Sequence, residues 1–460
     1  MTDRARVYLH QDQVDQLVRA YEGAGRRRLA VAAHGVVFDH GEVYHVYTDP
    51  PRTQFGGRHC GAEIVVGADP HETPAGTGVQ VTVLLSVVGG MPLARAFASG
   101  PDGMGPDGMG PDGTAPGTTA PGGVGPGSTA PGGVGECPVE LVPVHADLRA
   151  RSRSLLETDA LAARSVAVVG LGSGGSTIAV HLAQAGVGRM VLMDRDRLEI
   201  GNVTRHACGI GDVGRRKTAA VRDLLIGKNP HLDVRTVDAD VLGDRKVLER
   251  ALDGVDLLVA ATDTDSSRFQ LNEVAHDLGI TGLYGRVLSR ACGGEVLRVR
   301  PGRSACLACV YTDRFLATRP REYSDLAEAR RDAPAYASEA DVAATVQVGL
   351  ASDIAPVANM IVKLALVELT RDVPGAAGLA GLDDDLTADF YVWANRRELV
   401  YRTWSVMGST FTTPSILRWY GASHPRLATC LVCGPTVRGT TVAGAGRAGG
   451  RADESIFVAG

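Results

Sequence analysis

The sequence has no apolar run long enough to cross a membrane and little cysteine for its length. A membrane-spanning helix needs about 18 uncharged residues in succession. The most apolar helical stretch, 354–369, is interrupted by Asn359, Lys363 and Glu368. The opening residues, MTDRARVYLHQDQ, contain no apolar run of the signal-peptide kind. Eight cysteines in 460 residues are too few for a disulfide scaffold. These absences predict a cytoplasmic protein that does not contact a membrane.

The chain also lacks a large charge of either sign. It has 47 basic and 52 acidic side chains, which give a net charge of −5. A protein without an excess of basic residues has no electrostatic reason to bind nucleic acid, and we expect none. The hydrophobic content of 44% and the charged content of 22% are those of a globular chain. A chain of this length is expected to form more than one domain.

Glycine and proline are unevenly distributed along the chain. Between residues 100 and 135, proline recurs at every fifth position in repeats such as GPDGM and APGGV. A collagen helix requires glycine at every third position, which this segment does not provide. The repeat therefore predicts a solvated linker that cannot bury a core. The Gly-rich end of the chain, 434–460, is predicted to be a disordered tail.

The linker interrupts a small N-terminal unit, which we place at residues 1–150. Helical spacing covers 11–21, and apolar alternation predicts an α+β unit with the following strands: 28–38, 43–48, 79–88 and 139–144. If the last strand pairs within the same unit, the linker is an insertion in one of its loops. We predict a small partner or accessory domain.

A different pattern begins near Arg164 and defines a second domain, which we place at 151–433. Short, largely apolar runs occur at 165–170, 190–194, 234–239 and 256–262. Segments of helical length separate these runs, at 175–186, 214–228 and 244–253. Buried parallel strands joined by crossover helices produce this order. The pattern predicts an α/β fold with a doubly wound, Rossmann-like, mostly parallel sheet.

A glycine-rich loop follows the first strand of that sheet. Gly170, Gly172 and Gly175 match G-x-G-x-x-G, and Ser173 lies between them. Such glycines allow a tight turn and let the backbone approach phosphate oxygens at a helix N-terminus. Asp194 ends the second strand, where an acid accepts hydrogen bonds from a ribose hydroxyl. The loop predicts a nucleotide site and leaves NAD and ATP as alternatives.

Polar residues after the next strand ends favour ATP. Asp196, Asn202, Arg205 and Lys217 follow the ribose acid. Two cations there are suited to triphosphate oxygens and to the charge that develops on departing pyrophosphate. The fourth strand ends at Thr262-Asp263-Thr264, where a carboxylate is placed to hold Mg²⁺ against the phosphates.

Four cysteines form two C-x-x-C pairs. The pairs are Cys306 with Cys309 and Cys430 with Cys433. Four thiolates complete a tetrahedral zinc shell without an open position, which is typical of a structural site. Two unrelated buried pairs are the alternative. A zinc site would fasten the end of the chain to the sheet domain.

These motifs resemble those of the ThiF/MoeB/HesA family, the adenylating enzymes related to ubiquitin activators. The resemblance covers about 150–433 and rests on the glycine loop, D-x-D-x-x-x-x-x-N-x-x-R from Asp194 to Arg205, Lys217, Thr262-Asp263 and the paired cysteines. It implies that Asp194 holds the ribose and that Arg205 and Lys217 bind the phosphates. It further implies that Asp263 positions magnesium and that the protein is a homodimer.

The sequence departs from the family pattern at several positions. Ser173 stands where the family usually has glycine, and His206 replaces the common glutamine after the arginine. Family members that pass their adenylate to a thioester carry a cysteine beyond the first zinc pair, and residues 310–353 contain none. Cys60 in the N-terminal unit is the alternative acceptor, although a buried, unreactive thiol is the simpler interpretation. The resemblance therefore implies adenylation and gives no support to a thioester step.

The predicted activity is the ATP-dependent adenylation of the C-terminal carboxylate of a small ubiquitin-like or sulfur-carrier protein, with ATP, Mg²⁺ and structural Zn²⁺ as cofactors. A first alternative keeps this chemistry and changes the substrate to a peptide or small carboxylate of a biosynthetic pathway. A second alternative, from another class, is an NAD-dependent oxidoreductase on the same glycine loop.

Overall fold

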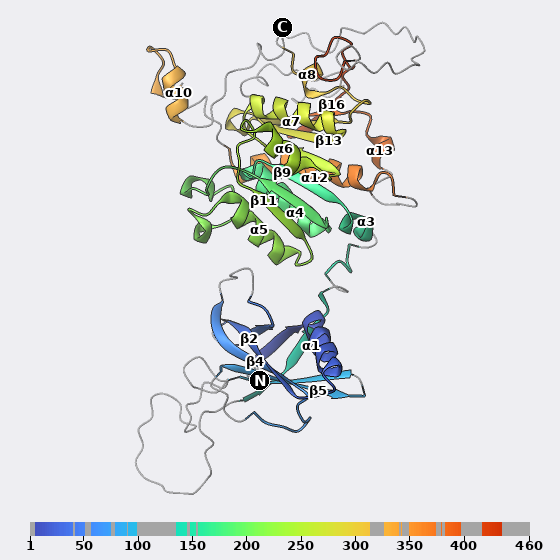
Figure 1. Ribbon diagram of the computed structural model, residues 1–460. Coiled ribbons are helices and arrows are strands. Elements are labelled where there is room, and N and C mark those ends of the chain that lie inside the picture. Colours follow the sequence, from blue (N-terminus) through green and yellow to red (C-terminus); the bar gives the residue numbers. More distant parts are fainter. Residues whose placement is uncertain are drawn as a thin grey trace. The chain divides into compact units, whose positions relative to one another are not determined.

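The computed structural model describes two compact units, divided after Arg151 (Figure 1). The described residues are 5–39, 42–50, 57–74, 79–89, 91–98, 135–144, 148–152, 155–312, 326–339, 342, 349–373, 379, 382–396 and 416–434. The linker predicted at 100–135 and the tail predicted at 434–460 lie outside this part of the chain, apart from Gly135 and Gly434. None of the described helices combines the length and the apolar character that a bilayer crossing requires.

The first unit is one mixed sheet with a helix. Its elements are β1 (Arg6–His10), α1 (Gln11–Gly23), β2 (Leu29–Phe38), β3 (Val43–Tyr47), β4 (Arg58–Val66), β5 (Val81–Val88), β6 (Met91–Ala98), β7 (Gly135–Cys137) and β8 (Val139–Val142). The strand order is β7-β6-β5-β4-β2-β3-β1-β8. β7 and β8 lie at the two ends of this order, but only Pro138 separates them in the chain. Because β7 pairs with β6 and β8 pairs with β1, this continuous stretch joins the two edges and the sheet closes on itself. The strand predicted at 139–144 is present as β8 and pairs with β1.

The larger core of the first unit lies on one face of this sheet. Val14, Leu17 and Val18 of α1 pack there with alternate residues of the strands, including Val7 and Val46. Residues two apart along a strand point to the same face of the sheet, so the alternation places these apolar side chains on the face that α1 covers. A smaller buried cluster of Val65, Ala68, Leu84 and Phe97 is separate from this core.

The second unit is an α/β sandwich around another eight-stranded sheet, in the order β11-β10-β9-β12-β13-β14-β15-β16. The strands are β9 (Ser165–Val169), β10 (Arg189–Met193), β11 (Asp233–Val237), β12 (Leu257–Ala260), β13 (Thr281–Val287), β14 (Gly293–Val299), β15 (Phe390–Ala394) and β16 (Arg418–Ala422). The pairs from β11 to β13 are parallel, and those from β13 to β16 are antiparallel. The prediction of an α/β fold is confirmed, and the sheet is mixed.

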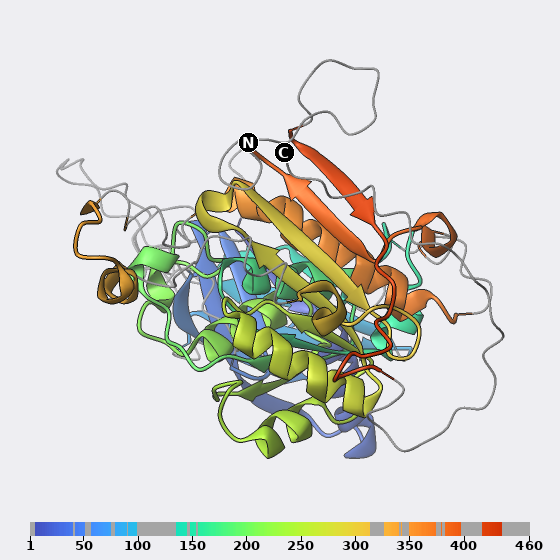
Figure 2. The ribbon, with the colours of Figure 1, turned by 90° about the horizontal axis from the view of Figure 1, so that it is seen from above.

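Helices cover both faces of this sheet (Figures 1 and 2). One face carries α4 (Ser173–Ala185), α5 (Lys217–Lys228) and α12 (Ala351–Thr370), and the other carries α6 (Arg245–Leu252), α7 (Asp265–Leu278) and α8 (Leu307–Val310). All five residues of β9 are buried, as expected for a central parallel strand with helices on both sides. The short segments α3 (Thr158–Ala162), α10 (Leu326–Asp332), α13 (Leu382–Asp385) and the 3-10 turns η2 (Ile200–Asn202), η3 (Ile210–Asp212) and η4 (Ser289–Ala291) complete the described elements.

Candidate nucleotide site

The order of the strands places a crevice at the carboxyl ends of β9 and β12. These neighbouring strands are parallel, but the chain leaves β9 toward β10 and β11 and then returns to the other side of β9 as β12. Open α/β sheets bind their ligands at such a reversal of strand order. The predicted glycine loop follows β9, and the predicted Thr262-Asp263-Thr264 segment follows β12.

Two glycines of the loop are required by close packing. Gly170 has a φ of +87°, and a Cβ atom there would lie 2.7 Å from the carbonyl carbon of Ala261. A Cβ atom on Gly175 would lie 1.8 Å from the carbonyl oxygen of Gly170. A larger residue at Gly170 would push the loop away from the segment that follows β12, and one at Gly175 would push α4 away from the loop. Gly172 is the N-cap of α4 and opens the helix toward the crevice.

Asp194, the predicted ribose acid, accepts one hydrogen bond from the backbone of the glycine loop and one from the backbone of its own turn. Its Oδ2 atom accepts a hydrogen bond from the Leu171 N–H at 2.6 Å, and its Oδ1 atom accepts one from the Asp196 N–H at 2.8 Å. Burial raises the pKa of Asp194, against the opposite effects of Lys217 and of these hydrogen bonds. The carboxylate therefore fixes the shape of the loop.

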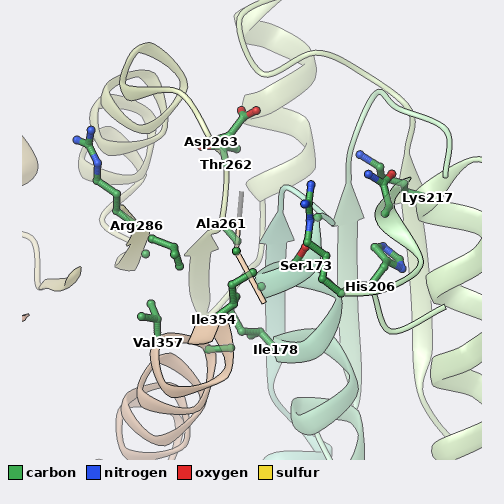
Figure 3. A pocket seen from close by; sticks show the side chains of 18 of the residues that line it. Ser173, Ile178, His206, Lys217, Ala261, Thr262, Asp263, Arg286, Ile354 and Val357 are labelled. Atoms are coloured by element: carbon green, nitrogen blue, oxygen red, sulfur yellow. The ribbon is translucent and has the colours of Figure 1, made fainter. Parts of the chain in front are cut away.

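A cavity of about 360 Å³ lies in the crevice (Figure 3). The predicted site residues that line it are Gly172, Ser173, Asp196, Asn202, Arg205, Lys217 and Asp263. The other four predicted residues, Gly170, Gly175, Asp194 and Thr264, do not line it. Gly170, Gly175 and Asp194 belong to the packing of the loop. Thr264 is the N-cap of α7, where its Oγ1 atom accepts a hydrogen bond from the Ser267 N–H at 3.3 Å.

Charged side chains of both signs line this cavity. Lys217, at the start of α5, pairs with the Asp196 carboxylate at 3.0 Å. Asn202 Oδ1 accepts a hydrogen bond from the Glu199 N–H at 3.1 Å, which fixes the turn that leads to Arg205. Asp263 extends from the end of β12, and Figure 3 shows it across the cavity from Lys217. This distribution suits an anionic ligand on one side and a divalent cation bound to it.

The sequence did not predict the wall of the cavity that α12 forms. Ile354, Val357 and Ile361 of α12 form an apolar surface there, and Arg286 of β13 lies beside it. Arg286 is buried and pairs with Asp265 at 3.0 Å. The apolar spacing of 354–369 indicated a helix, but nothing in the pattern showed that this helix would face the nucleotide loop.

The two C-x-x-C pairs come together on the α7 side of the sheet. All four sulfur atoms lie within 4.8 Å of one another, and all four residues are buried. The Cys306–Cys430, Cys309–Cys433 and Cys306–Cys309 sulfur pairs are separated by 3.5, 3.3 and 3.9 Å. Tetrahedral zinc with bonds of about 2.3 Å separates its sulfur ligands by roughly 3.8 Å. The cluster therefore fits a metal of this size, and the thiolate donors are those that zinc prefers.

The remaining four cysteines are not placed as nucleophiles. Cys137, Cys208 and Cys292 are buried, and Cys60 is half-buried in β4. Burial raises the pKa of Cys208 to about 12, and burial also raises the pKa of Cys60. A thiol with a raised pKa holds little of the reactive thiolate near neutral pH.

A model described as the ThiF family matches residues 147–387 of the chain. The chain is 31% identical over 163 residues to ubiquitin-like modifier-activating enzyme 5 of Caenorhabditis elegans, a match of 34% of this chain and 39% of that protein. It is 32% identical over 158 residues to the protein of the same name from Oryza sativa subsp. japonica, a match of 32% of this chain and 37% of that protein. The chain thus spans about two fifths of the length of these relatives.

Among solved structures, Escherichia coli MccB with ATP is similar to the chain. The similarity covers 60% of this chain and 68% of MccB, at 17% sequence identity and a TM-score of 0.42.

Proposed function

The chain belongs to the ThiF family, and from this premise we propose that it adenylates a carboxylate with ATP. The observation that carries the proposal is the meeting of Asn202, Arg205, Lys217 and Asp263 in one cavity at the N-terminus of α4. Family membership favours ATP over the NAD-dependent alternative. It also favours a carboxylate substrate of the ubiquitin-like or peptide kind.

In the proposed reaction, a carboxylate oxygen of the substrate attacks the α-phosphorus of ATP. A new phosphorus–oxygen bond forms, the bond to the β-phosphate oxygen breaks, and the products are an acyl adenylate and pyrophosphate. The step needs no protein nucleophile, because orientation and electrostatic stabilisation are sufficient for transfer at phosphorus.

The site residues predicted from the sequence have proposed roles in this step. The α4 N-terminus, with Gly172 and Ser173, faces the phosphates with backbone N–H groups. Arg205 and Lys217 neutralise the charge that grows on pyrophosphate, and Asn202 supports the turn that carries Arg205. Asp194 shapes the loop at the ribose end. Asp263 supplies a carboxylate ligand of the magnesium site, beside Thr264 at the N-cap of α7, and a bound Mg²⁺ would screen the phosphate charge.

The favoured substrate is the C-terminal carboxylate of a small ubiquitin-like or sulfur-carrier protein. The apolar wall formed by Ile354, Val357 and Ile361 offers an uncharged surface for the last residues of such a chain. ATP–pyrophosphate exchange with the purified full chain tests the proposal. Exchange that depends on an added carboxylate is expected, whereas its absence with ubiquitin-like proteins, peptides and small acids alike would rule out adenylation.

A second candidate keeps the chemistry and takes a peptide or small carboxylate as substrate. The placement of the cysteines favours it, because the four that lie outside the tetracysteine cluster are buried or half-buried, and burial raises the pKa of Cys60 and of Cys208. After incubation with ATP and substrate, we expect no covalent adduct that dithiothreitol releases, and Cys60→Ser should exchange pyrophosphate as the parent chain does. A thiol-sensitive adduct that disappears in Cys60→Ser would instead assign a thioester step to Cys60.

We further propose that the tetracysteine cluster binds structural zinc, that the first unit recognises a protein partner, and that the chain acts as a homodimer. The zinc proposal rests on the sulfur spacing, and the dimer on membership of the family. Light scattering after size-exclusion chromatography measures the oligomeric state, and a monomeric mass at micromolar concentration would contradict the dimer.

A further inference from the structure

His206 lies between the glycine loop and the segment that carries Arg205. Its side chain is buried at the edge of the cavity, on the same side as Lys217 (Figure 3). The imidazole Nε2 atom lies 2.8 Å from the carbonyl oxygen of Leu171, and the Nδ1 atom accepts a hydrogen bond from the Cys208 N–H at 3.0 Å. Because Nδ1 accepts, the ring proton is on Nε2, which donates to Leu171. The geometry thus specifies one neutral tautomer.

These two hydrogen bonds join the parts of the site that would contact a nucleotide. The peptide of Leu171 is held at both polar atoms, since its N–H donates to Asp194 and its carbonyl accepts from His206. On the other side, the N–H groups of Arg205 and His206 both donate to the Asn202 carbonyl at 2.9 Å.

One more bond reinforces this connection. The N–H of Ala207 donates to Ser176 Oγ in the first turn of α4 at 3.2 Å. The segment from Asn202 to Cys208 is therefore docked on the glycine loop and on α4, with the imidazole at the centre of the contact.

We propose that His206 is a positioning residue for the nucleotide, because its neutral ring fastens the glycine loop to the Arg205 segment and a second ring proton releases it. This inference rests on the nucleotide site of the proposed function, and it adds a residue to which that function gives no part. A proton on Nδ1 would replace the acceptor by a donor that faces the Cys208 N–H. Two donors cannot bond to each other, so the contact would open.

The charged groups that face the ring come from three elements: Lys217 on α5, Asp194 after β10 and Asp212 in η3. Burial is the largest effect and lowers the pKa of His206; the Leu171 carbonyl raises it, Lys217 lowers it, and the two aspartates raise it. The net direction is below the ordinary value, so the ring is neutral near pH 7. The unfolded chain takes up this proton near pH 6.5. The neutral ring therefore makes its full contribution to folding stability and to nucleotide affinity above about pH 6.5. Both contributions are lost as the pH falls through the lowered pKa of the folded state.

Three variants of the full chain test the proposal by equilibrium binding of a fluorescent ATP analogue between pH 5.5 and 8.5. In His206→Gln, an amide that cannot titrate replaces the ring and retains one donor and one acceptor. In His206→Phe, the ring volume is kept and both hydrogen bonds are lost. His181→Gln is the matched control, since His181 lies on α4 and does not line the cavity.

The parent chain and His181→Gln should lose up to about tenfold in affinity per pH unit below the pKa, as expected for one linked proton. His206→Gln should bind as tightly as the parent at pH 8 and lose this pH dependence. Titration of the nucleotide phosphates is common to all variants and cancels in the comparison. His206→Phe should bind about 5- to 150-fold more weakly at every pH, because two buried backbone groups lose their partner.

Hydrogen–deuterium exchange of the peptide that spans 168–176 gives a readout that needs no nucleotide. Its protection should decrease at pH 5.5 in the parent chain and not in His206→Gln, relative to pH 8 and after correction for the intrinsic exchange rate. A parent-like pH profile in His206→Gln, or parent-like affinity in His206→Phe at pH 8, would overturn the proposal. Loss of adenylation with every carboxylate, together with the expected binding profiles, would overturn the proposed function alone.

Discussion

The Lys217 ammonium lies 3.0 Å from the Asp196 carboxylate at the mouth of the glycine-loop cavity. The Lys217 side chain is 12% exposed and that of Asp196 is 55% exposed, so the lysine is held inward by an acid that faces solvent. The backbone strengthens this relationship, because the Lys217 N–H donates to the Asp196 carbonyl at 3.1 Å. The lysine is thus oriented toward the cavity before any anion enters.

Lys217→Ala should reduce ATP–pyrophosphate exchange by about 10²- to 10³-fold, the usual effect of removing one group that stabilises charge in the transition state. Lys228→Ala, at the exposed end of the same helix, is the matched control and should leave the rate unchanged. Equal activity in the two variants would remove Lys217 from the proposed mechanism.

Asp263→Asn should raise the concentration of Mg²⁺ that half-maximal exchange requires, because an amide is a weaker ligand for a hard cation than a carboxylate. Initial rates over a magnesium titration measure this shift, which we expect to be about tenfold or more, since one lost charge-assisted contact is worth ~1.5–3 kcal/mol. Asp253→Asn, at the end of α6 and away from the cavity, should keep the parent value. An unchanged magnesium requirement in Asp263→Asn would refute the assignment.

Cys306→Ser should abolish stoichiometric zinc in the purified protein, as determined by mass spectrometry of the metal. Burial raises the pKa of Cys430, but hydrogen bonds from the backbone of Cys433 and Val432 and from the thiols of Cys306 and Cys309 together lower it to about 7. Metal binding to thiolates competes with protons, so the parent chain should release its zinc as the pH falls. Cys60→Ser is the control, since Cys60 lies outside the cluster. A parent chain without metal after purification in zinc-containing medium would contradict the structural zinc site.

Glu368→Gln should destabilise the second unit by about 3–5 kcal/mol, because it removes a buried anion shared by cations. The Glu368 carboxylate is 2% exposed and pairs with Arg298 at 3.3 Å, Arg300 at 2.5 Å and Arg371 at 3.0 Å. Urea denaturation followed by circular dichroism measures the change. Glu249→Gln breaks the exposed helix pair with Arg245 instead and should cost less than about 1 kcal/mol. Similar losses in both variants would mean that the buried arginines find other partners.

The parallel half of the second sheet was predictable because strand and helix signals there are local. The predicted strand at 165–170 is β9, and the helix predicted at 214–228 is α5, which begins at Lys217. The pairing of the antiparallel half was not predicted, because β14 and β15 lie far apart in the chain and the alternation within a strand does not specify its partner. In the first unit, the sequence likewise missed β4, which ends in Ile64, Val65 and Val66 but begins in a polar and Gly-rich stretch.

The residues of the candidate site likewise fall into those that the sequence predicted and those that it did not. Lys217 and Asp263 were found because each follows a recognisable motif at an element boundary. The role of His206 depends on two backbone groups, those of Leu171 and Cys208, and hydrogen bonds to the backbone carry no signature in the sequence. The apolar wall of α12 was missed for a related reason. Apolar spacing predicts that a helix face is buried, but it does not predict which part of the fold that face contacts.

The closure of the N-terminal sheet has a consequence for how the chain tolerates cleavage. The described strands on either side of the Gly/Pro repeat, β6 and β7, are antiparallel neighbours in the register Ala96–Cys137, Phe97–Glu136 and Ala98–Gly135. Arg95 also pairs with Glu136 at 2.7 Å across the two strands. The two ends of the repeat are thus fastened together by the sheet itself. A protease cut within the repeat would yield two fragments that remain one folded unit, and the number of pentads could change without altering the order of the strands.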